Sequence, residues 1–198
     1  MSSSSAPTRR IGGPDSQSRA MLLDAAEQLM VEEGYAAVTS RRVAGKAGLK
    51  PQLVHYYFRT MDDLFVELFR RRADVNLERF ERAVEADGSL RNLWRLNADP
   101  RGSAVTIEFV ALANHRKAIR AEIARYAERF RAAQLAAITA ALEANGAADQ
   151  MPPVVALLLM TGLTQMMALE RALGVTTGHD ATMTYIDDAL TRLEPGRS

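Results

Sequence analysis

The chain has 198 residues, 25 Lys and Arg against 24 Asp and Glu, and a formal net charge of +1. This length allows one domain or two small ones with a substantial buried core, and the charge balance excludes a polycation that coats nucleic acid indiscriminately. Cysteine is absent, which excludes disulfides, thiol catalysis and cysteine-ligated metal.

Residues 1–16 are polar and rich in Ser, Gly and Pro, which predicts a disordered tail. The segment lacks the apolar core of a signal peptide, so we expect a cytoplasmic protein. Arg9 and Arg10 have two interpretations: contact with a DNA minor groove, or, as we favour, a solvated tail.

The first helix is predicted over residues 17–33. Its apolar side chains recur at helical spacing: Leu22, Leu23, Ala26, Leu29 and Met30. We expect Ser16 to cap this helix and Gly34 to end it.

Residues 39–58 predict two short helices joined by a tight turn. Thr39 is a suitable N-cap, Gly48 can turn the chain, and Pro51 suits a first helical position. Between residues 36 and 61 there is no acidic residue, and the five basic ones are Arg41, Arg42, Lys46, Lys50 and Arg59. Because a phosphate backbone requires such local charge, we interpret this segment as a DNA-binding helix-turn-helix.

The remaining chain also has helical periodicity, without sustained strand alternation or a repeat of fixed period. A long helix is expected from Met61 or Asp62 to about residue 87, followed by helices over about 90–96, 103–114, 117–144, 152–174 and 180–193. The stop between the second and third of these is placed over Asp99, Pro100, Arg101 and Gly102. The predicted fold class is all-α.

Residues 18–68 resemble the DNA-binding domain of the tetracycline-repressor (TetR) family of bacterial regulators. The motifs that carry the resemblance are Glu33-Gly34-Tyr35, Val38-Thr39, Val43-Ala44, Ala47-Gly48-Leu49, Tyr56-Tyr57-Phe58 and Asp62-Asp63-Leu64. The resemblance implies an N-terminal three-helix domain, which we place at residues 17–61, and an effector-binding and dimerisation domain at residues 62–198. His55 and Met61 depart from the tyrosine and lysine usual in the family.

Base contacts are predicted for the second short helix. Gln52 and His55 lie three residues apart, so they share a face from which both can bond base edges in the major groove. Lys50 and Pro51 lie at the helix start, where this motif approaches the groove most closely. Phosphate contacts are expected from Thr39, Arg41, Tyr56, Tyr57 and Arg59. For Tyr57, packing against the first helix is an equal alternative, and Phe58 is expected in the core.

The TetR resemblance implies a pocket for a small effector within the second domain. Candidate wall residues are Trp94, Phe109, Leu112, Tyr126, Phe130, Met160, Met166 and Met167. For each of them the alternative is an ordinary place in the apolar core. Methionine adapts its shape, which favours a largely apolar effector. No cofactor or metal is expected, because the three histidines are far apart and have no metal-binding spacing.

The last two long helices are predicted to form the interface of a homodimer. Val154 to Met160 is apolar on every side, which favours a helix buried on two fronts. The apolar stretch of about 16 residues is short for a membrane span, so we expect none. The sequence therefore predicts a repressor that binds a palindromic double-stranded DNA operator as a dimer and is released by an effector. The alternatives are ligand-assisted DNA binding or activation, and a helical enzyme.

Overall fold

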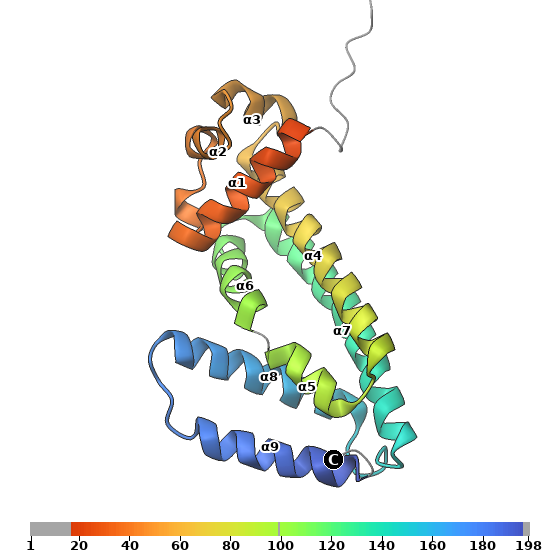
Figure 1. Ribbon diagram of the computed structural model, residues 1–198. Coiled ribbons are helices and arrows are strands. Elements are labelled where there is room, and N and C mark those ends of the chain that lie inside the picture. Colours follow the sequence, from red (N-terminus) through yellow and green to blue (C-terminus); the bar gives the residue numbers. More distant parts are fainter. Residues whose placement is uncertain (1–16, 99, 196–198) are drawn as a thin grey trace, which may run out of the picture. The chain divides into compact units, whose positions relative to one another are not determined.

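The computed structural model describes residues 17–98 and 100–195, and for residues 100–106 the backbone alone. All regular structure in these ranges is helical, which confirms the all-α fold class (Figure 1). The elements are α1 (Gln17–Glu33), η1 (Tyr35–Ala37), α2 (Ser40–Lys46), α3 (Pro51–Tyr57), α4 (Met61–Ala86), α5 (Leu90–Ala98), α6 (Pro100–Ala113), α7 (Lys117–Ala144), α8 (Pro153–Ala172) and α9 (His179–Leu193). Ser16, Arg9 and Arg10 lie outside the described residues.

The helices pack as two compact units, the first ending at Leu68 and the second beginning at Phe69. Helix α4 belongs to both, because it runs from Met61 to Ala86 without a break. The proposed division into domains after Met61 therefore falls at the start of α4, and the division between compact units falls inside this helix.

The core of the first unit consists of the apolar stripes of its helices. The buried side chains include Leu22, Leu23, Ala26, Leu29, Met30, Val43, Ala44, Val54, Phe58, Leu64 and Phe65. Gly34 follows α1 with φ of 80°, a left-handed conformation that glycine adopts without steric cost. Since the amide of Gly34 still donates to the carbonyl of Met30, the chain ends α1 and turns at once toward α2.

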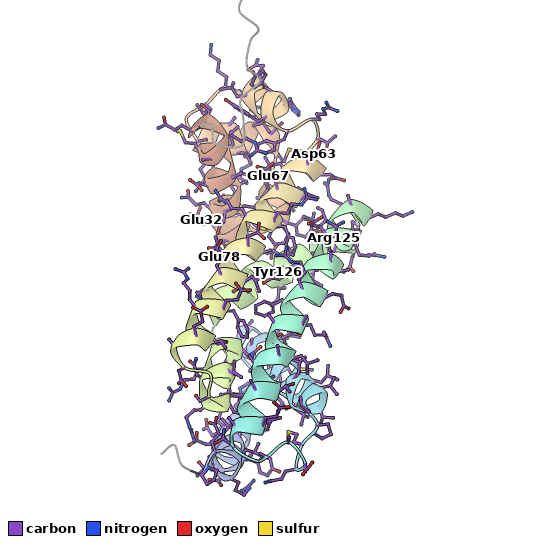
Figure 2. All side chains as sticks on the ribbon, turned by 90° about the vertical axis from the view of Figure 1, so that its right-hand side faces the viewer. Glu32, Asp63, Glu67, Glu78, Arg125 and Tyr126 are labelled. Atoms are coloured by element: carbon purple, nitrogen blue, oxygen red, sulfur yellow. The ribbon has the colours of Figure 1, made fainter. Side chains whose placement is uncertain are left out.

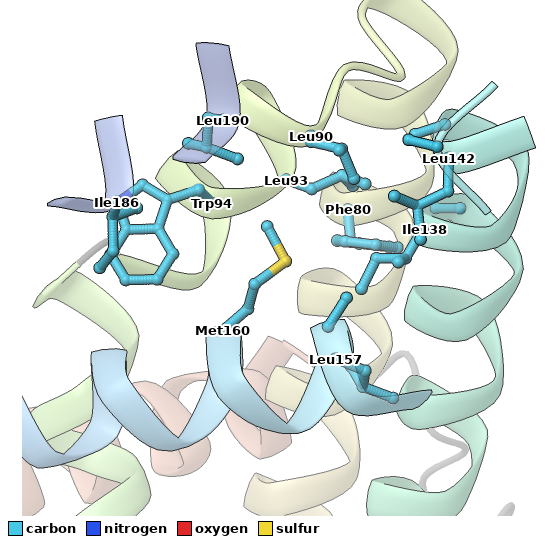
Figure 3. Close-up of a cluster of buried hydrophobic side chains, with 14 residues drawn as sticks. Phe80, Leu90, Leu93, Trp94, Ile138, Leu142, Leu157, Met160, Ile186 and Leu190 are labelled. Atoms are coloured by element: carbon cyan, nitrogen blue, oxygen red, sulfur yellow. The ribbon is translucent and has the colours of Figure 1, made fainter. Parts of the chain in front are cut away.

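The core of the second unit gathers side chains from α4, α5, α7, α8 and α9 (Figure 3). Its large members are Phe80, Leu90, Leu93, Trp94, Ile138, Leu142, Leu157, Met160, Ile186 and Leu190. The buried carboxylate of Glu194, just beyond α9, accepts hydrogen bonds from the amides of Leu90 at 2.6 Å and Arg91 at 3.3 Å. These amides are otherwise orphan donors at the start of α5, so Glu194 caps that helix.

Helix α6 begins at Pro100, so the prediction of a stop was wrong for residues 100–102, which are helical. Proline lacks an N–H and has φ fixed near the helical value, and both properties suit the first turn of a helix. Pro100 therefore belongs to the first turn of α6.

Helix α8 is 20 residues long and, by length and composition, could cross a membrane. The helix is longer than the apolar stretch of about 16 residues counted in the sequence, because it begins at Pro153 and continues to Ala172. The hydroxyls of Thr161 and Thr164 donate to carbonyls one turn earlier, at 2.8 Å in each case. One side of the helix, including Leu157 and Met160, lies in the core of the second unit, as in the core helix of a globular protein.

Candidate DNA-binding and effector sites

The turn between α2 and α3 has the chemistry predicted from its sequence. The Thr39 hydroxyl accepts a hydrogen bond from the amide of Arg42 at 3.4 Å and caps α2. Gly48 has φ of 67°, and the amide of Leu49 donates to the carbonyl of Ala44 at 2.9 Å. Pro51 begins α3. Thr39 thus caps the start of α2, and Gly48 and Pro51 form the turn that leads from α2 to α3.

Helix α3 has one buried side and one exposed side. Val54 and the following Phe58 are buried in the core of the first unit, whereas Gln52, His55 and Tyr56 are exposed. Gln52 and His55 are three positions apart, so their polar groups extend from one face of the helix. The exposed side therefore presents the hydrogen-bonding groups of Gln52, His55 and Tyr56.

Tyr57 is half-buried, and its ring meets that of Tyr56 edge to face, with centroids 5.0 Å apart. Lys50 and Pro51, at the start of α3, and Thr39, Arg41 and Arg59 around it are exposed. The structure thus brings the nine proposed DNA-contacting residues together within the first unit, eight of them exposed and Tyr57 in part.

Arg19 on α1 is a residue of this domain that the sequence pattern did not single out. Its guanidinium lies over the ring of Phe58, 5.4 Å from the centroid, and is paired with Glu67 on α4. Because Phe58 is the C-cap of α3, one side chain connects the first helix, the end of α3 and the start of α4. Spacing in α1 could not have revealed this, since Glu67 is 48 residues away.

The start of α4 has a reciprocal cap. The Thr60 hydroxyl accepts from the amide of Asp63 at 3.1 Å, and the Asp63 carboxylate accepts from the amide of Thr60 at 3.0 Å. This arrangement satisfies two amides at the helix start. Met61, which stands where a lysine is usual, is half-buried, whereas the neighbouring Arg59 is exposed.

The eight candidate effector-contacting residues do not share one environment. Trp94 and Met160 belong to the core of the second unit, and Phe130 packs against it. Four others differ widely in exposure, since Phe109, Leu112 and Met167 are buried and Met166 is 54% exposed. Tyr126 is partly buried on α7.

Tyr126 lines a hollow of about 30 Å³ where α7 runs beside the middle of α4 (Figure 2). The other lining residues are Phe69, Arg70, Ala73, Asp74, Glu122, Arg125 and Arg129. The Phe69 ring meets Tyr126 edge to face at 5.6 Å and Phe109 at 5.1 Å. Because pockets for drug-sized ligands enclose about 300–1,000 Å³, this hollow has room for water but not for an effector.

A polar network joins α4 to α7 around this hollow. Arg70 donates two hydrogen bonds of 2.9 Å to the Glu122 carboxylate, and Arg125 donates a third. The bonds from Arg70 hold the pKa of Glu122 below its usual value. The Tyr126 hydroxyl accepts from Asn76 at 2.7 Å, and burial raises the pKa of this phenol. Arg70, Asn76 and Glu122 had no signal in the sequence, because their pairing spans about 50 residues.

Helices α8 and α9 and the segment that connects them expose many apolar side chains. Its members are Val154, Val155, Leu158, Leu159, Leu163, Met166, Leu169, Leu173, Val175, Met183 and Tyr185, and we call this set the α8–α9 surface. Large exposed apolar surfaces mark interaction sites in soluble proteins.

Within the described chain, no group of three His, Asp or Glu side chains is placed to hold a metal ion. His55 and His115 are exposed, and His179 is buried with its Nε2 atom 2.7 Å from the Glu170 carboxylate. His179 therefore has an ordinary structural partner.

Comparisons with known proteins relate the first unit to a family and the whole chain to a fold. Residues 22–68 match the model of the bacterial regulatory proteins, tetR family. The fatty acid metabolism regulator protein of Bacillus subtilis is 27% identical over 64 residues, which span 32% of this chain and 33% of that protein. The match thus covers about a third of the relative's length.

Two solved structures are similar over most of the chain. The fatty acid degradation regulator FadR from Bacillus halodurans has a TM-score of 0.69 at 16% identity, covering 93% of this chain and 97% of that one. The multidrug binding protein EbrR, solved with imidazole, has a TM-score of 0.60 at 24% identity, covering 93% and 98%. At these identities the likeness shows the fold of the second unit and not its ligand.

Proposed function

Because the chain belongs to the tetR family of bacterial regulatory proteins, we propose that it is a ligand-responsive transcriptional repressor. In this proposal a cytoplasmic homodimer binds a palindromic operator and is released by a small-molecule effector. The observation that carries the proposal is α3, which is anchored by Val54 and Phe58 and exposes Gln52 and His55 on one face. Such a helix suits the major groove, where base edges display a distinct pattern of donors and acceptors.

The roles proposed for the DNA-binding residues follow from this placement. Gln52 and His55 read base edges, and Lys50 and Pro51 lie closest to the groove. Thr39, Arg41, Tyr56, Tyr57 and Arg59 contact phosphates and position the domain. No catalytic role is proposed, since the matched family consists of regulatory proteins.

Binding to duplex DNA should depend strongly on salt. Exposed cations displace counterions from phosphates, so log Kobs should fall linearly with log salt, by about 0.9 for each phosphate neutralised. Fluorescence anisotropy with a palindromic operator, chosen from intergenic DNA beside the gene, measures this slope. A flat slope, or the absence of any bound site, would overturn the regulator proposal.

Replacing Gln52 by alanine should weaken binding to the best operator by about 1–3 kcal/mol and relax its sequence preference. The matched control is Arg41→Ala, which should weaken all sequences alike because phosphates are the same everywhere. Titrations on the operator and on shuffled DNA separate the two effects. Equal losses on both DNAs for Gln52→Ala would remove Gln52 from base recognition.

Dimerisation is assigned to the α8–α9 surface, which exposes apolar side chains from both helices. A two-fold axis presents the same patch from each copy. Two copies of α3 enter successive major grooves only if they are separated by one helical turn of DNA, about 34–36 Å. The dimer interface is therefore part of the proposed DNA-binding mechanism.

The effector site is proposed in the second unit, among the eight candidate residues named above. Met160, Met166 and Met167 favour a largely apolar effector, and two similar proteins are named for fatty acid metabolism or degradation. Because the hollow at Tyr126 holds only about 30 Å³, binding of an effector at this place requires a more open conformation. It shifts the population only by its differential affinity for the two conformations. The opposite mode, ligand-assisted DNA binding, requires the effector to favour the DNA-binding conformation instead.

A further inference from the structure

Two carboxylates at the end of α1 contact two of the five cations counted in the DNA-binding segment. Glu33 Oε1 lies 2.5 Å from Arg42 Nη2, and Glu32 Oε2 lies 2.7 Å from Lys46 Nζ. Arg42 and Lys46 are four residues apart on α2, so one face of this helix carries both cations. These carboxylates precede the segment that lacks acidic residues, and the fold brings them back to it.

The position of the two carboxylates is unfavourable for α1 itself. The C-terminal end of a helix carries a partial negative charge, which disfavours acidic side chains there. The last turn of α1 contains Glu32 and Glu33 but no basic residue. The cations of α2 offset this repulsion: the hydrogen bond with Arg42 lowers the pKa of Glu33, and the same bond raises the pKa of Arg42.

A cation that is paired with a carboxylate attracts DNA phosphates less strongly than an unpaired cation does. A Glu–Arg pair has no net charge, so an approaching phosphate gains little from it. Drawing Arg42 onto a phosphate would leave the Glu33 carboxylate uncompensated beside a polyanion. Arg41, Lys50 and Arg59 are exposed and have no such carboxylate partner among the described residues.

We propose that Glu32 and Glu33 limit sequence-independent DNA binding by withholding Lys46 and Arg42 from phosphates. Each subunit then meets the DNA backbone with its three other cations. Backbone charge supplies essentially all of non-specific binding, so fewer available cations leave more of the affinity to base contacts. The inference rests on the proposed DNA-binding function and adds residues of α1 to it.

The test is the salt dependence of binding to random duplex DNA by the full-length chain. Glu33→Gln should release Arg42, tighten binding to random DNA, and steepen the log–log slope by about 0.9 per subunit. Glu32→Gln should do the same through Lys46. Circular dichroism before titration establishes that each variant retains the wild-type helix content.

A double-mutant cycle separates local pairing from the general effect of removing negative charge. Arg42→Gln alone should leave the slope unchanged, and Glu33→Gln combined with Arg42→Gln should restore the wild-type slope. The inference is overturned if Arg42→Gln flattens the slope by about 0.9 per subunit, because Arg42 would then already contact phosphate. It is also overturned if Glu33→Gln tightens binding equally with and without Arg42. Failure of the wild-type protein to bind DNA would instead overturn the proposed function.

Discussion

Placing arginine at Leu158 should convert the dimer to a folded monomer and weaken operator binding by about 10²–10⁴-fold. The side chains of Leu158 and Leu159 are 51% and 49% exposed, so neither is part of the core, and a charge at either position should not unfold the second unit. In a symmetric dimer the new charge faces its own copy across the two-fold axis and is desolvated there. A monomer contacts only one half-site of the operator. Linking two binding modules raises the overall affinity by about 10²–10⁴-fold, so this gain is lost with the dimer.

Sedimentation at micromolar concentration measures the oligomeric state, and anisotropy measures operator binding. The matched control is Val75→Arg, since Val75 is an apolar residue of α4 with 59% exposure and lies outside the α8–α9 surface. This variant should stay dimeric. If the wild-type protein itself sediments as a monomer, both the proposed interface and the mechanism with two half-sites are wrong.

Trp94→Ala should lower the free energy of unfolding by about 3–5 kcal/mol, the cost of deleting a large buried aromatic ring and leaving a cavity. Trp94 is only 6% exposed and lies between α8 and α9, close to Met160 and Ile186 (Figure 3). Urea denaturation followed by circular dichroism, at fixed protein concentration, measures the loss. Fixed concentration is needed because dimerisation shifts apparent stability by mass action.

The neighbouring Arg95 offers the control, because it is exposed on the same helix. Arg95→Ala should change the free energy of unfolding by no more than about 0.5 kcal/mol, as is usual for surface positions. A loss near 1 kcal/mol or less for Trp94→Ala would contradict the placement of Trp94 in the core. That result would favour a side chain that is retained for ligand contact.

The first unit was the more predictable part of the fold, because its signals are local. Thr39, Gly48 and Pro51 each act within a few residues of their own position, so a cap, a turn and a helix start could be predicted from sequence. Helix α7 was predicted from Lys117 to Ala144 for the same reason, and Asn145 and Gly146 end it. Pro100 was ambiguous, since a proline is compatible both with the end of one helix and with the first turn of the next.

Features that depend on distant residues could not be predicted. The charge count of the DNA-binding segment missed Glu32 and Glu33, because nothing in α1 shows that its end meets α2. The pairing of Arg70 with Glu122 spans 52 residues. For the candidate effector residues, helical spacing places a side chain on an apolar face. Spacing alone does not distinguish the buried Phe109 from the exposed Met166.

The cap of α5 by Glu194 has a consequence for synthesis on the ribosome. The carboxylate that accepts the hydrogen bond from the amide of Leu90 lies 104 residues later in the chain. During translation at about 5–20 residues per second, α5 therefore emerges several seconds before the carboxylate that completes its first turn. The contacts of the first unit all lie within residues 17–68 and are available much earlier. A nascent chain can thus complete its helix-turn-helix while the second unit is still unfinished.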